Sequence, residues 1–146
     1  MPTLAAIAFK DKKRGIMKPL QSANVTTESG VENDIFGRPG KRQVTIMSQQ
    51  QWQQACDELN QQLDWLTRRV NLLIDGYTFC ATDVGKRIYL GESTILEITG
   101  ETDPCSKMEK SVTGLEAALT LDWRGGITAK VIASGHITIA DTVVIK

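Results

Sequence analysis

The closing stretch of the chain, residues 128–145, reads TAKVIASGHITIADTVVI and decides the fold class. It holds three short runs with the β-branched content of strands, at residues 128–133, 137–140 and 142–145. Ser134-Gly135 and Asp141 separate these runs, and such residue types favour turns. Short strands at this close spacing are typical of a barrel or a folded sheet.

The same pattern continues towards the N-terminus. Further strands are predicted at residues 5–9, 22–27, 43–47, 71–74, 87–90 and 94–99. Residues 30–41 contain three glycines and a proline, which predicts a long loop or a hairpin. Because 146 residues fit one domain, we expect a mainly β fold with a few helices: a single β-barrel-like domain over residues 1–146.

One helix is predicted to start at Ser48 and to end before Arg68. Ser48 and Gln51 have the spacing of a capping box. Apolar residues then recur at steps of three and four, as on one face of a helix: Trp52, Cys56, Leu59, Leu63 and Leu66. A second, short helix is expected at residues 111–121, with Gly114 as its weak point.

Composition excludes several classes of protein. Seventeen basic and seventeen acidic residues cancel, which gives no global support for binding nucleic acid or an anionic membrane. No apolar run approaches the roughly 20 residues that span a bilayer, and no basic segment precedes the short apolar stretch at the N-terminus. We therefore expect a cytoplasmic protein with neither nucleic acid nor membrane as its partner.

The three cysteines are an odd number without paired spacing, which argues against a disulfide scaffold or a CxxC metal site. Cys105 follows Pro104 at the end of a predicted strand, and Lys107 two residues on can lower the pKa of its thiol. A thiolate is a nucleophile and a ligand for soft metals; the alternative is a small buried hydrophobic residue. Cys56 is predicted to lie in the core and Cys80 to be structural.

The basic residues give a second signal. They cluster at residues 38–42, 68–69, 86–87 and 123–126, mostly beside glycines or at the ends of predicted elements. Arginine forks suit phosphate or carboxylate, so converging loops can form an anion pocket; ordinary solvated charges are the alternative. The GxxxxGK[ST] spacing of a P-loop is absent.

Carboxylates are the third signal. Glu32 and Asp34 lie in the glycine-bounded loop and can bind loop amides or an arginine, although an Asx-type turn is equally compatible with Asp34. Asp122 and Arg124 can place an acid and a base in one cavity mouth. The lone histidine, His136, is expected in an exposed turn, so Ser-His-Asp catalysis is excluded unless His136 itself serves.

An ordered series of segments, from about Ile7 to the end of the chain, resembles the MOSC family, the domain named for the C-terminal part of molybdenum cofactor sulfurases. These segments are GVEND (30–34), KRQVT (41–45), RVNLL (69–73), VGKRIYLGE (84–92), PC (104–105), WRGGITAKV (123–131) and GHITIADTV (135–143). The family's loop often has a glycine before its aspartate and a histidine two residues after it. This chain has Asn33 and Phe36 at those positions.

The resemblance implies a β-barrel-like domain whose family cysteine is Cys105. That cysteine would ligate molybdenum in the molybdopterin cofactor or carry sulfur as a persulfide. The pterin carries a phosphate, and the resemblance implies a set of residues that bind this cofactor: Arg42, Arg69, Arg124 and Lys107, with Asn71 as a polar contact and Asp34 as the organiser of its loop.

Three functional hypotheses follow from the resemblance. The first is a molybdenum-dependent oxidoreductase that reduces N-hydroxylated compounds, with an electron-donor protein as partner because no flavin or nicotinamide fingerprint is present. The second is a sulfur carrier in which a cysteine desulfurase loads Cys105 and the persulfide is used for a metal-sulfur cluster or a cofactor. The third is a non-catalytic binding domain. Pyridoxal phosphate is not expected in this chain alone.

Overall fold

The computed structural model describes residues 1–102, 104 and 106–146, so Asp103 and Cys105 lie outside the described residues. The strands are β1 (Thr3–Phe9), β2 (Lys18–Leu20), β3 (Ser22–Thr26), β4 (Gly30–Val31), β5 (Val44–Ser48), β6 (Leu72–Asp75), β7 (Arg87–Leu90), β8 (Thr94–Glu101), β9 (Ile127–Ala133), β10 (Gly135–Thr138) and β11 (Val143–Ile145). The helices are α1 (Gln49–Glu58), α2 (Ser106–Ser111) and α3 (Leu115–Thr120), with short 3-10 turns η1 (Trp65–Arg68), η2 (Ala81–Asp83) and η3 (Leu121–Trp123).

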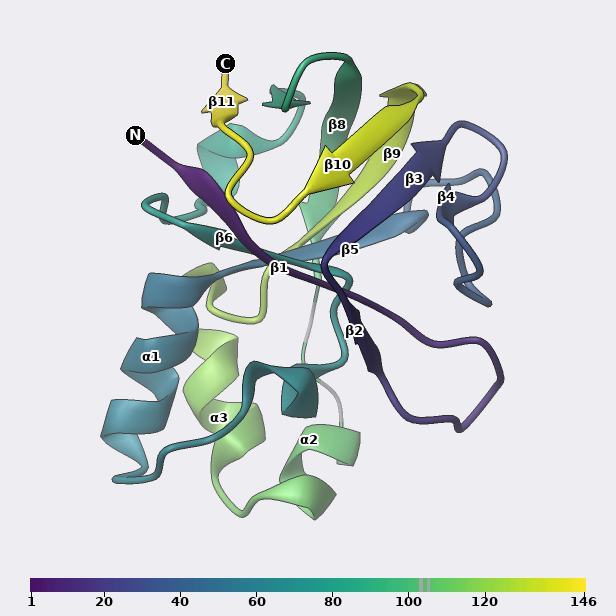
Figure 1. The fold of residues 1–146 in the computed structure, drawn as a ribbon. Helices are drawn as coiled ribbons and strands as arrows, with labels where there is room; N and C mark the ends of the chain where they lie inside the picture. The colour runs from purple at the N-terminus through teal and green to yellow at the C-terminus, as the bar shows by residue number, and fades with distance from the viewer. Residues whose placement is uncertain (103, 105) are drawn as a thin grey trace.

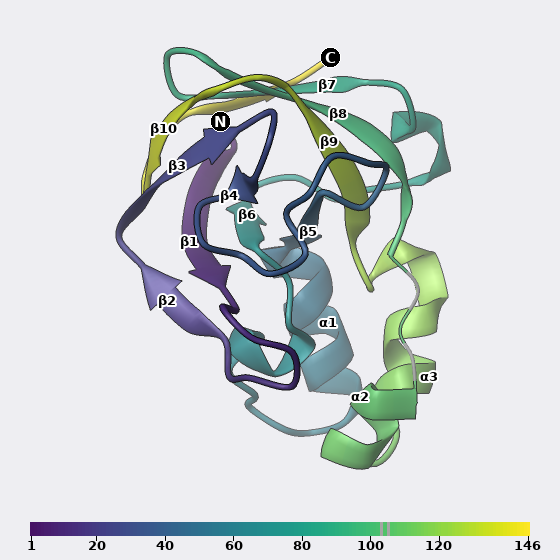
Figure 2. The same ribbon diagram turned by 90° about the vertical axis from the view of Figure 1, so that its right-hand side faces the viewer.

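The strands form two sheets around one core. The larger sheet has the order β11-β7-β8-β9-β5-β6-β1-β2 and the smaller has the order β10-β3-β4. Only β5 and β6 pair in parallel among the described strands of the larger sheet. Both views show the larger sheet curled, with β3 and β10 on its open side (Figures 1 and 2). The expectation of a mainly β, barrel-like domain is confirmed.

The period of two along the strands sorts side chains between two cores. Ile46 and Leu72 face the space that the two sheets enclose. Met47 and Leu73, the next residues on the same strands, face the helices instead. The helices therefore cover the outside of β5 and β6, at the end of the molecule opposite to both termini (Figure 1).

Helix α1 starts where the sequence predicts. The hydroxyl of Ser48 accepts a hydrogen bond from the Gln51 N–H at 3.2 Å. The capping box is incomplete, because the Gln51 side chain binds Phe79 and Asp122 rather than returning to Ser48. The predicted extent was wrong: the helix ends at Glu58, and Asn60 takes a left-handed conformation with φ 52°.

The second predicted helix is shorter and has a neighbour that the sequence pattern did not indicate. Helix α3 covers Leu115–Thr120, and α2 precedes it at Ser106–Ser111. Gly114, with φ +89°, separates the two helices, as its prediction as a weak point implies. None of the helices in the described part of the chain is long and apolar enough to cross a membrane.

Candidate functional site

A cavity of about 650 Å³ lies where the end of β1, the loop between β4 and β5, the start of β6 and the segment before α2 meet. We call the β4–β5 connection, residues 32–43, the 32–43 loop. The cavity wall includes Pro104 and Lys107, which bracket Cys105 in the sequence. Cys105 itself is not among the described residues.

Basic side chains dominate the cavity. They are Lys10, Arg38, Arg42, Arg68, Arg69 and Lys107. Asp34 is the only carboxylate among the described residues of the lining. The structure therefore brings together Asp34, Arg42, Arg69, Asn71 and Lys107, five of the residues that the resemblance implies. A cavity with this surplus of positive charge favours an anionic ligand.

Lys10 is the most buried lysine of this group and was not among the predicted site residues. It follows β1 directly, and the residue is 9% exposed. Burial lowers the pKa of its ammonium group, and the charges of Arg69 and Lys107 lower it further, whereas Asp34 raises it. The ammonium nitrogen lies 5.0 Å from the centre of the Phe36 ring. Lys10 is therefore a cation held in the cavity against the repulsion of its neighbours.

Asp34 accepts hydrogen bonds from the 32–43 loop and from the end of β1. Its Oδ1 accepts a hydrogen bond from the Lys10 backbone N–H at 2.9 Å, and its Oδ2 accepts one from the Phe36 N–H at 3.3 Å. The Ile35 N–H in turn donates to the Lys10 carbonyl oxygen at 2.8 Å. Glu32, the other predicted carboxylate, accepts from the Asn24 N–H at 3.0 Å. These contacts join the loop to β1 and β3.

The far end of the 32–43 loop is held just as firmly. The Gln43 side chain donates to the carbonyl oxygens of Thr27 and Gly37 and accepts from the Val131 N–H. A Cβ at Gly37 would lie 1.8 Å from the Ser29 carbonyl oxygen, so only glycine fits this close approach. The arginines of the loop are thus carried on a backbone that hydrogen bonds hold at both ends.

Asn71 lines the cavity and connects three strands through hydrogen bonds. Its Oδ1 accepts from the N–H and the hydroxyl of Thr45, at 3.1 and 3.2 Å, and its Nδ2 donates to the Ala8 carbonyl oxygen at 3.2 Å. The side chain therefore links β1, β5 and the start of β6. Its amide groups are used by the protein, which favours a positioning role over a direct contact with a ligand.

Arg68 is buried and braces the segment that leads to Cys105. Its Nε donates to the Gly125 carbonyl oxygen and its Nη2 to that of Thr102, both at 3.1 Å. The Thr102 N–H donates to the Gly126 carbonyl oxygen at 2.9 Å. A Cβ at Gly125 would lie 2.6 Å from the Thr102 carbonyl oxygen, so the two segments approach as closely as glycine allows.

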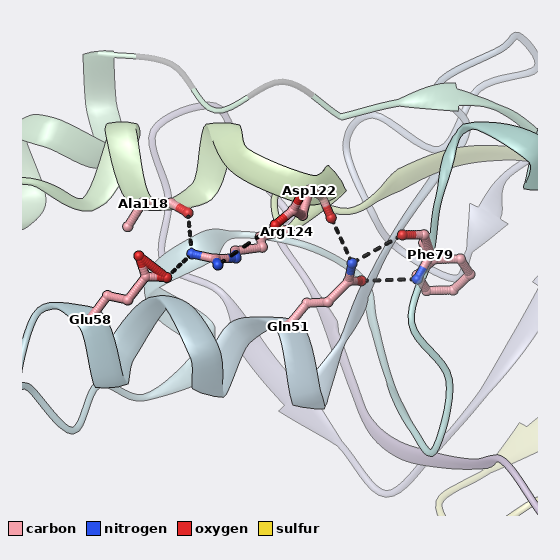
Figure 3. A network of polar contacts seen from close by, with 6 residues as sticks. All are labelled: Gln51, Glu58, Phe79, Ala118, Asp122 and Arg124. Atoms are coloured by element: carbon pink, nitrogen blue, oxygen red, sulfur yellow. Dashed lines mark hydrogen bonds and ion pairs between the residues drawn. The ribbon is translucent and has the colours of Figure 1, made fainter.

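Arg124 is not brought to the cavity wall. Figure 3 shows its guanidinium between α1 and α3, where Nη1 contacts Glu58 and the Ala118 carbonyl oxygen. In the same network the Gln51 amide donates to the carbonyl oxygens of Phe79 and Asp122. The exposed Asp122 carboxylate lies 3.9 Å from the buried Arg124 guanidinium, and neither residue lines the cavity. This network fixes the turn whose Gly125 carbonyl binds Arg68.

The remaining candidates lie elsewhere. Cys56 is buried among α1, α3 and the sheet, as predicted. Cys80 is exposed beside η2, where its backbone N–H donates to Asp83. His136 is exposed, but it lies in β10 rather than in a turn, and its Nδ1 is 2.8 Å from the Asn24 Oδ1. Among the described residues, no three His, Cys, Asp or Glu side chains are grouped to hold a metal ion.

Sequence reasoning missed Lys10 and used Arg68 only as part of a basic cluster. Lys10 had one signal, its position directly after a predicted strand. Its place in the cavity depends on the hydrogen bond from its backbone N–H to the carboxylate of Asp34, 24 residues away. Arg68 gave no signal that would separate it from Arg69, although the structure buries Arg68 and leaves Arg69 exposed.

Several solved structures have this fold. YuaD from Bacillus subtilis is 18% identical over 99% of this chain and 96% of that chain, with a TM-score of 0.82. YiiM from Geobacillus stearothermophilus is 13% identical over 100% of this chain and 75% of that chain, with a TM-score of 0.77. YiiM from Escherichia coli is 17% identical over 99% and 69%, with a TM-score of 0.71. No curated protein sequence matches the chain significantly.

The MOSC domain model matches residues 20–144, which is most of the chain. The match includes the 32–43 loop, Arg69, Lys107 and Cys105, whereas residues 1–19, which contain β1 and Lys10, and residues 145–146 lie outside it. The chain therefore belongs to the MOSC domain family, whose domains are related to the molybdenum cofactor.

Proposed function

We propose that the cavity binds the phosphate-bearing pterin of the molybdenum cofactor and that Cys105 supplies a thiolate ligand to the molybdenum. One observation carries this proposal. Basic side chains converge on one cavity, where Arg38, Arg42, Arg69 and Lys107 form no ion pair with a carboxylate of the described residues, and the cavity wall includes residues on both sides of Cys105 in the sequence. An anion is the ligand that such a cavity attracts.

The charges of the cavity fit a phosphate group. Lys10, Arg69 and Lys107 all line it, and the Lys10 backbone N–H donates to the Asp34 carboxylate. Three positive charges less the negative charge of Asp34 leave a surplus of two. A phosphate monoester at neutral pH carries about −1.5 to −2. We assign these three cations to the cofactor phosphate.

The rest of the lining fits the body of a pterin. Met17, Phe36 and Met108 give apolar wall, and the cavity volume of about 650 Å³ lies within the usual range for small-molecule sites, about 300–1,000 Å³. Thr102 also lines the cavity, and its buried hydroxyl has no hydrogen-bond partner among the described atoms. Such an orphaned group beside a cavity is compatible with a polar ligand.

When bound, the cofactor would supply two-electron chemistry at its metal. The residues of this chain bind and orient it: the cations hold the phosphate, and Arg68 fixes the backbone at Thr102 before Cys105. Conversion of an N-hydroxylated compound to the amine consumes two electrons and two protons and releases water. The electrons would come from a donor protein.

Molybdenum and pterin content test the proposal. The protein purified from a host that makes the cofactor is compared with Cys105→Ser and with Cys80→Ser, a control that removes an exposed cysteine outside the cavity lining. We expect both components in the wild type and in Cys80→Ser, and loss of molybdenum in Cys105→Ser. Absence of both components from the wild type would contradict the proposal.

Mass spectrometry of the same samples separates the sulfur-carrier alternative. A cofactor-free protein that gains the mass of one sulfur on Cys105 after incubation with a cysteine desulfurase would replace the first hypothesis with the second. Retention of cofactor in Cys105→Ser would show that the cavity binds the pterin without this thiolate.

A further inference from the structure

The turn between α3 and β9 has a strained backbone. Asp122 and Trp123 both lie in the left-handed region, with φ 50° and 59°, and they are the only sequence neighbours among the described non-glycine residues with positive φ. L-residues avoid this region because Cβ approaches a carbonyl oxygen, and a bulky side chain such as that of Trp123 is an outlier there. The adjacent Arg124 adds a buried Nε without a hydrogen-bond partner among the described atoms. Such features persist only where surrounding contacts enforce them.

Gln51 supplies a contact of this kind. The residue lies in α1 and is 4% exposed. Its Nε2 donates to the Asp122 carbonyl oxygen at 2.8 Å and to that of Phe79 at 3.0 Å, and its Oε1 accepts from the Phe79 N–H at 3.0 Å (Figure 3). The Asp122 side chain, by contrast, is 83% exposed. Gln51 therefore holds Asp122 by its backbone, at the strained position itself.

The turn reaches the cavity through backbone contacts. The Gly126 N–H donates to the Trp123 carbonyl oxygen at 3.1 Å, and the Gly126 carbonyl oxygen accepts from the Thr102 N–H at 2.9 Å. A Cβ at Gly125 would lie 2.6 Å from the Thr102 carbonyl oxygen and 3.2 Å from the Pro104 Cδ. Thr102 and Pro104 line the cavity. A displacement of the turn would therefore move this part of the cavity wall.

We propose that Gln51 is a positioning residue of the cavity: its amide holds the strained turn, and the turn fixes Thr102 and Pro104 in the cavity wall. Without the amide, the turn relaxes towards ordinary backbone conformations and the wall moves with it. The inference rests on the proposed function only in taking the cavity as the functional site. The coupling of Gln51 to the turn does not depend on which anion the cavity binds.

Two variants at residue 122 measure the strain. Asp122→Ala and Asp122→Gly both remove the exposed carboxylate, so the difference between them reports the backbone alone. Because glycine takes positive φ freely, Asp122→Gly should have a Tm higher than that of Asp122→Ala by about 2–4 °C. The matched control is Ala140→Gly, which makes the same alanine-to-glycine change at an exposed residue with φ 81° between β10 and β11. Equal Tm values for the two variants at residue 122 would overturn the inference.

Gln51→Leu tests the link from the turn to the cavity. Leucine fills a similar space but has no amide. We expect phosphate affinity, measured by calorimetry, to fall about fivefold, and the pH profile of Cys105 alkylation to shift. Adding Asp122→Gly should restore both, because glycine adopts the left-handed conformation without help from the amide. Adding Ala140→Gly should raise Tm and restore neither. Equal restoration by Ala140→Gly would overturn the inference, since the effect would then be one of overall stability.

Gln51→Glu takes the place of Gln51→Leu if the latter does not fold. Its carboxylate can accept from the Phe79 N–H but cannot donate to the Asp122 carbonyl oxygen. Where the isolated protein carries the cofactor, its molybdenum content replaces phosphate affinity and alkylation as the readout, with the same expected pattern. A folded Gln51 variant that leaves the readout unchanged would overturn the inference. A wild type without molybdenum and pterin, in which Asp122→Gly still rescues phosphate binding, would contradict the proposed function alone.

Discussion

The guanidinium of Arg68 donates from Nη2 to the carbonyl oxygen of Thr102 at 3.1 Å, three residues before Cys105 in the sequence. The same guanidinium donates from Nε to Gly125, the residue after the Arg124 network. Arg68 thus joins the turn between α3 and β9 to the end of β8. This side chain therefore helps to fix the segment that precedes the candidate thiolate.

Arg68→Lys should therefore disturb Cys105 and not only stability. Lysine keeps the charge but cannot donate to two carbonyl oxygens in the same planar geometry. Loss of charge-assisted hydrogen bonds from a buried site should lower the free energy of unfolding by about 2–3 kcal/mol, measured in urea. The pH profile of Cys105 alkylation should shift as well. An unchanged profile at reduced stability would show that Arg68 has only a structural role.

Lys10→Met should stabilise the protein and weaken its anion binding. The pKa of Lys10 lies below 10.5 because burial and the charges of Arg69 and Lys107 disfavour its charged form. Removing the ammonium relieves this repulsion, and a gain of about 1 kcal/mol would raise Tm by about 2–4 °C. Phosphate affinity, measured by calorimetry, should fall by tenfold. A lower Tm would contradict the conclusion that burial and neighbouring positive charges disfavour the Lys10 ammonium.

The sign of the pH dependence follows from the same pKa. Between the lowered pKa and 10.5 the unfolded chain binds more protons at Lys10 than the folded chain does. The contribution of Lys10 to the free energy of unfolding therefore becomes more favourable to the folded state as pH rises through this range. Phosphate affinity changes in the opposite direction, because the ammonium that attracts the anion is lost. Both dependences should be missing in Lys10→Met.

Asp83→Asn should destabilise the protein at neutral pH. Burial would raise the pKa of Asp83, but hydrogen bonds from the Tyr77 hydroxyl, the Lys86 ammonium and the Cys80 N–H hold it below its ordinary value. The stabilising contribution of this carboxylate is present above pH 3.8 and is lost as pH falls through the lowered folded pKa. We expect a loss of about 2–3 kcal/mol at pH 7 that shrinks in acid, by urea unfolding at several pH values.

Gly126→Ala should impair folding far more than Gly100→Ala. Gly126 has φ +102°, and a Cβ there would lie 2.3 Å from the Ile46 carbonyl oxygen. At Gly100 a Cβ would meet only the Thr128 hydroxyl, at an ordinary 3.6 Å. The first change should cost 3 kcal/mol or more and the second about 1 kcal/mol or less. Equal losses in thermal unfolding would contradict the close packing of the 124–126 turn on β5.

Most strands could be predicted from the sequence because period-two alternation and turn residues are local. The strand at 87–90 has the predicted bounds, and Ser48 caps α1 as expected. The length of α1 could not be predicted in the same way. The apolar spacing continues through Leu63 and Leu66, but a left-handed Asn60 ends the helix region, and the Trp52 indole donates to the Leu63 carbonyl oxygen in the connection that follows.

In the candidate site, too, local contacts could be predicted and contacts between distant segments could not. The bond from the Phe36 N–H to Asp34 is local and is the kind of contact that the sequence suggests, whereas the bond from the Lys10 N–H, 24 residues away, could not be predicted. Arg124 could not be placed, since its direction is decided by Glu58, 66 residues away. The position of Lys10 in the cavity could not be predicted either, because it depends on contacts between the end of β1 and the 32–43 loop, which are distant in the sequence.

Whether Cys105 and the cationic cavity form one site is measured most directly by the rate at which iodoacetamide alkylates Cys105 as phosphate is added at constant ionic strength. Exposed Cys80 in the same chain is the internal reference. We predict that phosphate changes the rate at Cys105 in a saturable way, leaves Cys80 unchanged, and loses its effect in Lys10→Met. A Cys105 rate that is indifferent to phosphate, or that follows the rate of Cys80, would contradict a shared site.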